Sequence, residues 1–275
     1  MFPPKKILFP VDFSDRCAAA ALMVEAFARR FQSELHVVHV TPPDAPDDPD
    51  DCADAKLVAF AARKEFQGLC VYRQMLQGDP AHEIVEFAHD HKFDLIMMPT
   101  HGYGIFRRFL LGSVTQKVLH DALCPVWTDA HTEALPSGRE AKFRSMVCAL
   151  DLSEKSRPTL RWAAQFAAST DARLLLVHAI PLVNAMEAAY VYADWQQELA
   201  DNAREQIDCM QRCEGTHAAV DIVTGEVANA VRNSAEDAKA DLLVIGRSLD
   251  DGLLGRLRTH AYPIIRHSPC PVVSV

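Results

Sequence analysis

The sequence predicts an α/β protein built from two doubly wound, five-stranded parallel sheets in tandem. The second half of the chain repeats the pattern of the first, and a polar segment separates the two halves. Within each half, short apolar segments of strand length alternate with segments of helical periodicity. Such alternation favours a parallel sheet with helices on both faces.

The repeat is visible where each half begins. ILFPVDFSDR (residues 7–16) and MVCALDLSEK (residues 146–155) both place an apolar run before Asp, an apolar residue, Ser, an acid and a base. The same correspondence extends along the chain to His39 with His178, Pro42 with Pro181, Gly78 with Gly225 and Asp94 with Asp241. Both halves close with Cys-Pro-Val, so the chain is a tandem duplication.

The duplication sets the expected domain boundaries. We expect a first domain over residues 1–128 and a second over residues 143–275. Residues 129–142 are polar, contain Pro, Ser and Gly, and are typical of a linker. Residues 42–54 are acidic and proline-rich, which predicts a solvated loop with a tendency to disorder.

Within the first half, each element has a local signal. The apolar segments that predict strands are residues 7–11, 35–40, 69–76, 94–98 and 125–128. Ser14 is expected to cap a helix whose apolar face comprises Cys17, Ala21, Val24, Ala28 and Phe31. Asp79-Pro80 predicts the start of another helix, because proline in the first helical position loses no needed hydrogen bond. A further helix is expected over SVTQKVLHDAL, with Ser113 as its cap.

Composition excludes several classes of protein. With 275 residues, 49% of them hydrophobic, the chain can form two cores. No apolar stretch reaches the roughly 18 residues of a membrane span, and Met1–Lys6 begins no signal peptide, so we expect a cytoplasmic protein without a membrane partner. A net charge of −9 argues against a protein that coats nucleic acid, since that affinity comes from clustered Lys and Arg.

No metal site is expected. The eight cysteines show no CxxC spacing, and Cys209 and Cys213, which can share a helix face, are interpreted as structural or incidental instead of as a metal or redox pair. His82, His89 and His91 do not form HExxH, and on a helix His89 and His91 point in different directions.

The predicted topology brings three segments to one place. In a doubly wound sheet, ligands bind beyond the carboxyl ends of the strands, near the point where strand order reverses. Asp12 follows the first predicted strand, Val40 ends the second, and residues 99–102 follow the fourth. Asp12 could accept a hydrogen bond from an adenine amine or a ribose hydroxyl, or it could instead cap the first helix beside Ser14.

The stretch PTHGYGIFRRFLLGSV (residues 99–114) is the candidate phosphate loop. Gly102 and Gly104 allow close backbone approach, and Gly112-Ser113 precedes a predicted helix whose N-terminus favours anions. Neither GxxxxGK[ST] nor GxGxxG occurs here, so from these residues alone an ordinary surface loop remains an alternative.

Four segments together resemble the universal stress protein family. They are the opening ILFPVDFS, the strand DLIMMPTHG, the spacing from Gly102 over nine residues to Gly112-Ser113, and the ending VLHDALCPVW, and both halves show the pattern. The resemblance implies a Rossmann-like, adenine nucleotide alpha hydrolase-like fold in a tandem two-domain member. It further implies ATP binding through Gly-x-x-Gly, nine residues, and Gly-Ser/Thr.

Carried onto this sequence, the resemblance implies a cofactor site in the first domain. Asp12 and the backbone at Val40 would hold the adenosine part, and Gly102, Gly112, Ser113 and Val114 would hold phosphates. The full set of candidate residues is Pro10, Val11, Asp12, Val40, Pro99, His101, Gly102, Gly112, Ser113 and Val114. Pro99 departs from the motif, since it replaces the first glycine and has neither an N–H nor free φ.

The second half departs further from the motif. Gly246 keeps the first glycine, but Leu249 replaces the second. Arg258 and Thr259 stand where Gly112 and Ser113 stand in the first half, and Pro263 falls in the first turns of the next predicted helix. We expect this half to bind no nucleotide and to pack against the first half as a built-in dimer partner.

Three hypotheses about function follow. The first is a stress-response protein that binds ATP or another adenine nucleotide in its first domain and acts through binding or conformational state. The second is a nucleotide-free, pseudo-dimeric interaction scaffold with an unknown protein partner; under either, a homodimer is expected. The third is a slow ATPase using His101, although His101 also suits a structural hydrogen bond. Arg107 and Arg108 could pair with phosphates or form a solvated edge.

Overall fold

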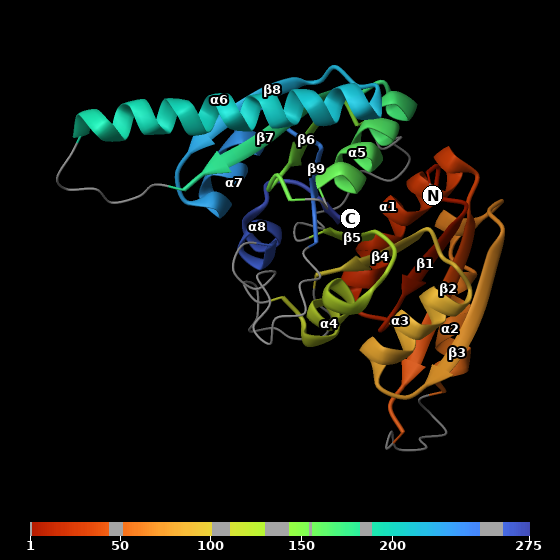
Figure 1. Cartoon of the computed structure of the whole chain (residues 1–275). Coiled ribbons are helices and arrows are strands. Elements are labelled where there is room, and N and C mark those ends of the chain that lie inside the picture. Colours follow the sequence, from red (N-terminus) through yellow and green to blue (C-terminus); the bar gives the residue numbers. More distant parts are fainter. Residues whose placement is uncertain are drawn as a thin grey trace. The chain divides into compact units, whose positions relative to one another are not determined.

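The fold was analysed in a computed structural model. It describes residues 2–43, 52–100, 111–129, 143–153, 156–181, 189–247 and 261–275. The chain forms two compact units whose boundary in the sequence lies between Ala141 and Lys142. Each unit has the α/β architecture expected from the sequence (Figure 1).

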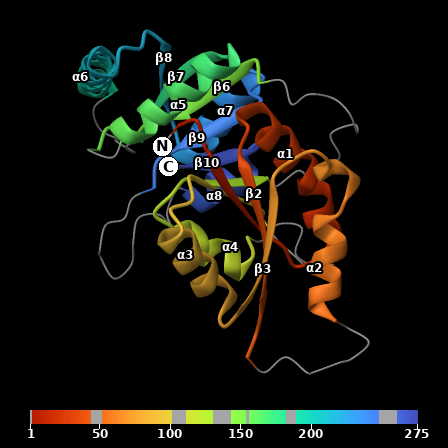
Figure 2. The same cartoon turned by 90° about the vertical axis from the view of Figure 1, so that its right-hand side faces the viewer.

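The first unit contains five strands in the order β3-β2-β1-β4-β5, so the order reverses between β1 and β4. Its elements are β1 (Lys6–Pro10), α1 (Asp15–Phe31), β2 (Glu34–Thr41), α2 (Ala53–Ala61), a 3₁₀ turn (Lys64–Phe66), β3 (Val71–Gln77), α3 (Pro80–Asp90), β4 (Leu95–Pro99), α4 (Ser113–Asp121) and β5 (Val126–Asp129). All neighbouring strands are parallel. Helices α1 and α2 cover one face of these strands, and α3 and α4 cover the other (Figure 2).

The predicted helix signals are confirmed in this unit. Ser14 caps α1 by accepting a hydrogen bond from the N–H of Cys17 at 3.3 Å, and Asp79 caps α3 through the N–H of His82 at 3.1 Å. All five residues of the predicted apolar face of α1 are buried. Pro80 occupies the first turn of α3, as its missing N–H permits.

The second unit repeats this arrangement with the strand order β10-β9-β6-β7-β8. Its elements are β6 (Ser145–Ala149), α5 (Ser156–Thr170), β7 (Arg173–Ile180), α6 (Ala189–Glu214), β8 (Ala219–Thr224), α7 (Val227–Asp237), β9 (Leu242–Ile245), α8 (Ala261–His267) and β10 (Val272–Ser274). Pro263 lies within the first turn of α8, as predicted. The correspondence of the two halves therefore extends from the sequence to the strand order.

The duplication also extends to unusual backbone conformations. Corresponding residues with positive φ are Phe13 and Leu152 (63° and 62°), Gln32 and Asp171 (52° and 56°), and Lys92 and Lys239 (54° and 49°). Gly78 and Gly225 follow β3 and β8 and have φ of 152° and 155°. Each donates its N–H to the carbonyl of the last residue of the neighbouring strand, Thr41 of β2 or Ile180 of β7. Both halves therefore use the same turns to join strands to helices.

Candidate functional site

The turn between β1 and α1 is organised by the carboxylate of Asp12. Its Oδ1 accepts hydrogen bonds from the N–H of Ser14 and from the thiol of Cys17, each at 3.0 Å. Burial raises the pKa of Asp12, but the hydrogen bonds from Ser14 and Cys17 outweigh that effect, so the pKa lies below its usual value. Burial and the adjacent Asp12 charge raise the pKa of Cys17 to about 12, which keeps the thiol protonated as a donor. Asp12 is therefore ionised at neutral pH.

The end of β2 lies beside this turn. Nδ1 of His39 hydrogen-bonds the carbonyl oxygen of Val11 at 2.7 Å, and its ring lies 4.4 Å from the ring of Phe13. Val40, the next residue, is buried at 8% exposure and pairs with Leu76 of β3. His39 is absent from the predicted site, although its correspondence with His178 in the repeat is a signal visible in the sequence. His178 makes the same contact, with the carbonyl of Leu150 at 2.8 Å.

The end of β4 and the start of α4 are joined by two hydrogen bonds. The N–H of Gly112 donates to the carbonyl of Thr100 at 2.9 Å, and the hydroxyl of Thr115 donates to the carbonyl of Pro99 at 3.3 Å. Pro99, Thr100 and Thr115 are all buried. These contacts fix the position of the α4 N-terminus relative to the carboxyl end of β4.

The prediction that Ser113 caps α4 is wrong. The cap is Gly112, which has extended backbone (φ −62°, ψ 147°) and whose carbonyl accepts the first helical hydrogen bond, from the N–H of Gln116 at 2.9 Å. Ser113 is consequently the first helical residue, and it is exposed. Gly112 has no side chain to satisfy the N–H groups of the first turn, whereas α1, α3 and α7 have side-chain caps in Ser14, Asp79 and Glu226.

This helix start can bind an anion. The N–H groups of a first helical turn have no acceptor within the helix, and the helix dipole places partial positive charge there. Ser113 and Val114 provide two of these N–H groups, and Ser113 adds an exposed hydroxyl. A phosphate or carboxylate at this position would meet backbone donors, and Gly112 offers no side chain that would compete for them.

The remaining predicted site residues fall into two groups. Pro10 and Val11 are buried at the end of β1, and the N–H of Val11 is already donated to the carbonyl of Val38 at 2.8 Å. His101 and Gly102 lie outside the described residues, as do Gly104, Arg107 and Arg108. Because β1 lies between β2 and β4, the parallel strands bring Asp12, Val40 and Pro99 to the same edge of the sheet.

The second half keeps the first turn and changes the last helix. Oδ1 of Asp151 accepts from the N–H and hydroxyl of Ser153 at 2.9 and 2.7 Å, and from the hydroxyl of Ser156 at 2.8 Å. Burial raises the pKa of Asp151, but these hydrogen bonds outweigh it and the pKa is lowered. The counterpart of α4 is α8, a helix of 7 residues that contains Pro263. Leu249, Arg258 and Thr259 lie outside the described residues.

Two features are absent from the described residues. No group of three or more His, Cys, Asp or Glu side chains there is arranged to hold a metal ion. No described helix has the length and apolar character needed to cross a membrane.

Comparisons with known proteins agree with this architecture. The model of the universal stress protein family matches twice, at residues 3–128 and 142–275. Universal stress protein MJ0531 of Methanocaldococcus jannaschii is 34% identical over 135 residues, which cover 44% of this chain and 79% of that protein. A universal stress protein of Thermus aquaticus is 38% identical over 131 residues, covering 44% of this chain and 96% of that protein.

A solved structure matches both halves at once. The crystal structure of a universal stress protein from Archaeoglobus fulgidus is 22% identical, with a TM-score of 0.68. The match covers 98% of this chain and 95% of that chain, so the likeness in fold extends over the whole length. With two consecutive family matches, curated relatives of one domain each and this common fold, the chain belongs to the universal stress protein family as a tandem two-domain member.

Proposed function

We propose that the first half binds ATP or a closely related adenine nucleotide at the carboxyl edge of its sheet, and that the protein acts through this bound state without rapid turnover. One observation carries the proposal. The N-terminus of α4 has no side-chain cap and is fixed beside the end of β4 by the hydrogen bond from Gly112 to Thr100. Strand β4 is the neighbour of β1, and the strand order reverses between these two strands.

The phosphates would lie at the start of α4. The N–H groups of Ser113 and Val114 and the hydroxyl of Ser113 are the donors for phosphate oxygens, and the helix dipole adds favourable electrostatic energy. Gly102, at the family spacing from Gly112, is proposed as the second point of backbone approach. None of these contacts requires a charged side chain, which is compatible with the acidic composition of the chain.

The adenosine part would lie at the ends of β1 and β2. The hydrogen bonds to Asp12 from the Ser14 N–H and the Cys17 thiol both use Oδ1, and Oδ2 is the proposed oxygen for a ribose hydroxyl or the adenine amine. Because the pKa of Asp12 is lowered, this oxygen is an acceptor throughout the neutral range. The Val40 backbone is the proposed contact for the base, with Pro10 and Val11 as buried support beneath it.

Pro99 is compatible with this arrangement. Its carbonyl accepts from the Thr115 hydroxyl, so the residue helps to place α4 even though it has no N–H to offer a ligand. The nucleotide would therefore lose one backbone donor relative to the family motif and keep those of α4.

The second half is proposed as a partner domain without nucleotide, joined through the linker expected at residues 129–142, whose first residue, Asp129, is the last residue of β5. Its helix α8 contains Pro263, which has no N–H to offer a ligand. We propose that the two halves pair within one chain and that two chains associate as a homodimer in the cytoplasm. Sedimentation measurements on the intact chain test the association.

Gly112→Asp gives the sharpest test of the phosphate site. The backbone of Gly112 is extended, so a side chain there requires no strained backbone conformation, and an Asp cap would occupy the N–H groups with a negative charge. We expect ATP affinity to fall by at least about tenfold, equivalent to about 1.4 kcal/mol, while the melting temperature is unchanged or raised. Calorimetric titration and thermal unfolding measure the two effects.

Two matched variants complete the test. Gly112→Asn adds a neutral cap of the same size. It should weaken ATP binding less than Gly112→Asp does, because it blocks the N–H donors without adding a negative charge. Arg258→Ala combined with Thr259→Ala changes the corresponding positions of the second half and should leave affinity unchanged. Equal ATP affinity in wild type and Gly112→Asp would exclude phosphate binding at α4.

The scaffold remains the second candidate because Pro99 removes a motif donor and the second half lacks the motif. It predicts that wild type binds no adenine nucleotide and that Gly112→Asp leaves the capture of protein partners unchanged. Saturable ATP binding by the wild type would rule out a nucleotide-free scaffold.

A further inference from the structure

A small hollow in the second unit is lined by three sulfur-containing side chains. It has a volume of about 280 Å³ and lies between the start of α5 and the C-terminal part of α6. Its lining residues are Leu152, Ser153, Arg157, Gln206, Cys209, Met210 and Cys213. Neither thiol takes part in the proposed nucleotide site.

The two thiols lie one helical turn apart on α6. Cys209 and Cys213 are exposed free cysteines, and Met210 is partly exposed on the same stripe of the helix. Residues four apart on a helix have Cβ atoms about 5–6 Å apart, whereas a disulfide needs about 3.5–4.5 Å. A direct disulfide would therefore distort α6, but one atom bonded to both sulfurs could bridge them.

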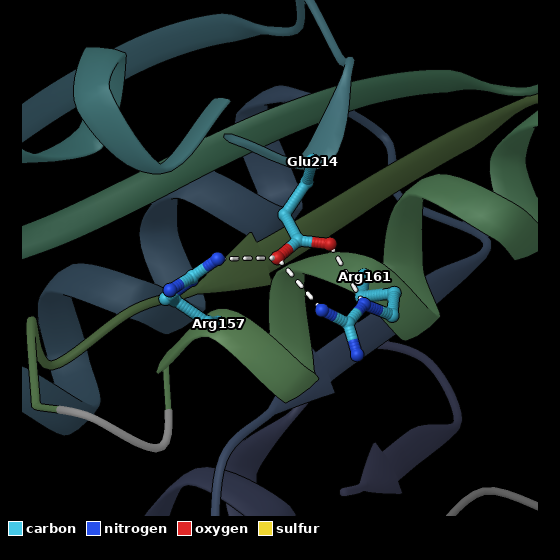
Figure 3. A network of polar contacts seen from close by, with 3 residues as sticks. All are labelled: Arg157, Arg161 and Glu214. Atoms are coloured by element: carbon cyan, nitrogen blue, oxygen red, sulfur yellow. Dashed lines mark hydrogen bonds and ion pairs between the residues drawn. The ribbon is translucent and has the colours of Figure 1, made fainter. Parts of the chain in front are cut away.

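Arg157, which lines the hollow, belongs to a cluster of charged side chains. Glu214, whose side chain is only 6% exposed, receives Nε and Nη2 of Arg161 at 2.7 and 3.0 Å, and Nη2 of Arg157 at 3.4 Å (Figure 3). The hydrogen bond from Arg161, against the effect of burial, lowers the pKa of Glu214, so the carboxylate is charged. Two guanidinium groups and one carboxylate leave this cluster with net positive charge beside the sulfurs.

We propose that the hollow binds a soft monovalent metal ion of the Cu(I) class, coordinated by the sulfurs of Cys209, Cys213 and Met210. Thiolate and thioether ligands select Cu(I) over the hard cations that carboxylates prefer. Binding forms two thiolate–metal bonds and one thioether–metal bond and releases the two thiol protons to solvent, with no change in oxidation state. The complex carries one net negative charge, which the cluster of Arg157, Arg161 and Glu214 complements.

The site belongs to the second half alone. Helix α2, which precedes β3 as α6 precedes β8, contains neither Cys nor Met over Ala53–Ala61. Cys52 and Cys70 are exposed thiols that do not line the hollow, so they are matched controls for unspecific thiol binding. The proposal is independent of nucleotide binding in the first half.

The test is an anaerobic competition between the full-length, reduced protein and the chromophoric Cu(I) chelator bicinchoninate. We expect wild type and Cys52→Ser/Cys70→Ser to withdraw one Cu(I) per chain, and Cys209→Ser/Cys213→Ser to withdraw none. Met210→Leu keeps the side-chain volume but loses a ligand. The Cu(I) affinity of this variant should fall by at least roughly 10-fold, because even substitutions of residues outside the ligand set cost that much.

A second measurement needs no variant. Cu(I)-loaded wild type is treated with iodoacetamide and digested, and the modified cysteines are identified by mass spectrometry. We expect Cys209 and Cys213 to be protected and Cys52 and Cys70 to be alkylated. No Cu(I) uptake by wild type, uptake that persists in Cys209→Ser/Cys213→Ser, or equal alkylation of all four thiols would overturn the proposal.

Discussion

The two halves of the chain share a framework and differ where a ligand would bind. Both have a positive-φ residue after their first strand and a carboxylate that organises that turn. In both, a histidine also hydrogen-bonds the carbonyl of the residue before that Asp. They diverge at the helix that follows the fourth strand of each half. There, α4 begins after the glycine cap Gly112, whereas α8 contains Pro263. Features that both halves share are therefore best explained by the needs of folding. Features that only one half has are best explained by ligand binding.

The same comparison clarifies Asp12. Its counterpart Asp151 is held by Ser153 and Ser156 in a half that we propose binds no nucleotide. The shared role of the two carboxylates is to order the turn before α1 or α5. A ligand role for Asp12 would use the second oxygen and would be additional to this structural role.

The largest expected effect distinguishes the two glycine turns. Gly78 and Gly225 both have a positive φ that L side chains rarely adopt, so alanine at either position costs about 1–3 kcal/mol. At Gly78 an added Cβ would also lie 2.5 Å from Oε1 of Glu83, whereas at Gly225 the nearest atom, Cβ of Ala230, is 3.8 Å away. We expect Gly78→Ala to lower the free energy of unfolding more than Gly225→Ala in denaturant titrations.

The double variant Gly78→Ala/Glu83→Ala serves as the control for that difference. Removing the Glu83 side chain should bring the penalty at Gly78 close to that at Gly225. An equal loss for the two single variants would show that the Glu83 contact has no energetic consequence.

A smaller effect concerns the two turn carboxylates. Asp12→Asn and Asp151→Asn replace charged acceptors by neutral ones, which costs about 1 kcal/mol each at neutral pH. Asp151 should show the larger loss, because both of its side-chain donors are hydroxyl groups, whereas at Asp12 the weaker thiol donor of Cys17 stands beside the side chain of Ser14. Urea titrations of the two variants at neutral pH give the comparison.

The pH dependence of these losses has a definite sign. Both folded-state pKa values lie below the ordinary 3.8, so the ionised carboxylates add stability above about pH 3.8, and this is lost as the pH falls through the folded-state values. The difference between wild type and each Asn variant should therefore shrink in strong acid. A difference that grows on acidification would contradict the assigned pKa directions.

The smallest effect is expected from exchanging the side chains that donate hydrogen bonds to the two turn carboxylates, Cys17 and Ser156. Cys17→Ser places in the first half the hydroxyl that Ser156 provides in the second, and Ser156→Cys makes the reverse change. Both side chains are buried and donate to the turn carboxylate, so each exchange should alter the free energy of unfolding by less than about 1 kcal/mol. Cys17→Ala, which removes the donor, should cost more than Cys17→Ser.

Local signals in the sequence were sufficient for much of the fold. Ser14 and Asp79-Pro80 mark helix starts because capping depends on neighbouring residues, and the apolar face of α1 follows from its periodicity. Ser113 was misassigned because the choice between Gly112 and Ser113 depends on the backbone of Gly112 and on its bond to Thr100. That bond belongs to tertiary structure, which sequence spacing does not reveal.

The sulfur-lined hollow shows the same limit. The helical spacing of Cys209 and Cys213 is visible in the sequence, and both residues do lie on α6. Their opposite wall, Leu152, Ser153 and Arg157, is distant in the sequence and comes close only when α5 packs against α6. The spacing alone therefore gave no reason to prefer a binding role.

The stoichiometry of nucleotide binding tests the central claim most directly. Calorimetric titration with ATP, combined with mass spectrometry of small molecules released on denaturing the fresh protein, counts sites per chain. Our account predicts one nucleotide per chain, lost in Gly112→Asp and retained in Arg258→Ala/Thr259→Ala. Two nucleotides per chain, or one that survives Gly112→Asp, would contradict the assignment of binding to the first half alone.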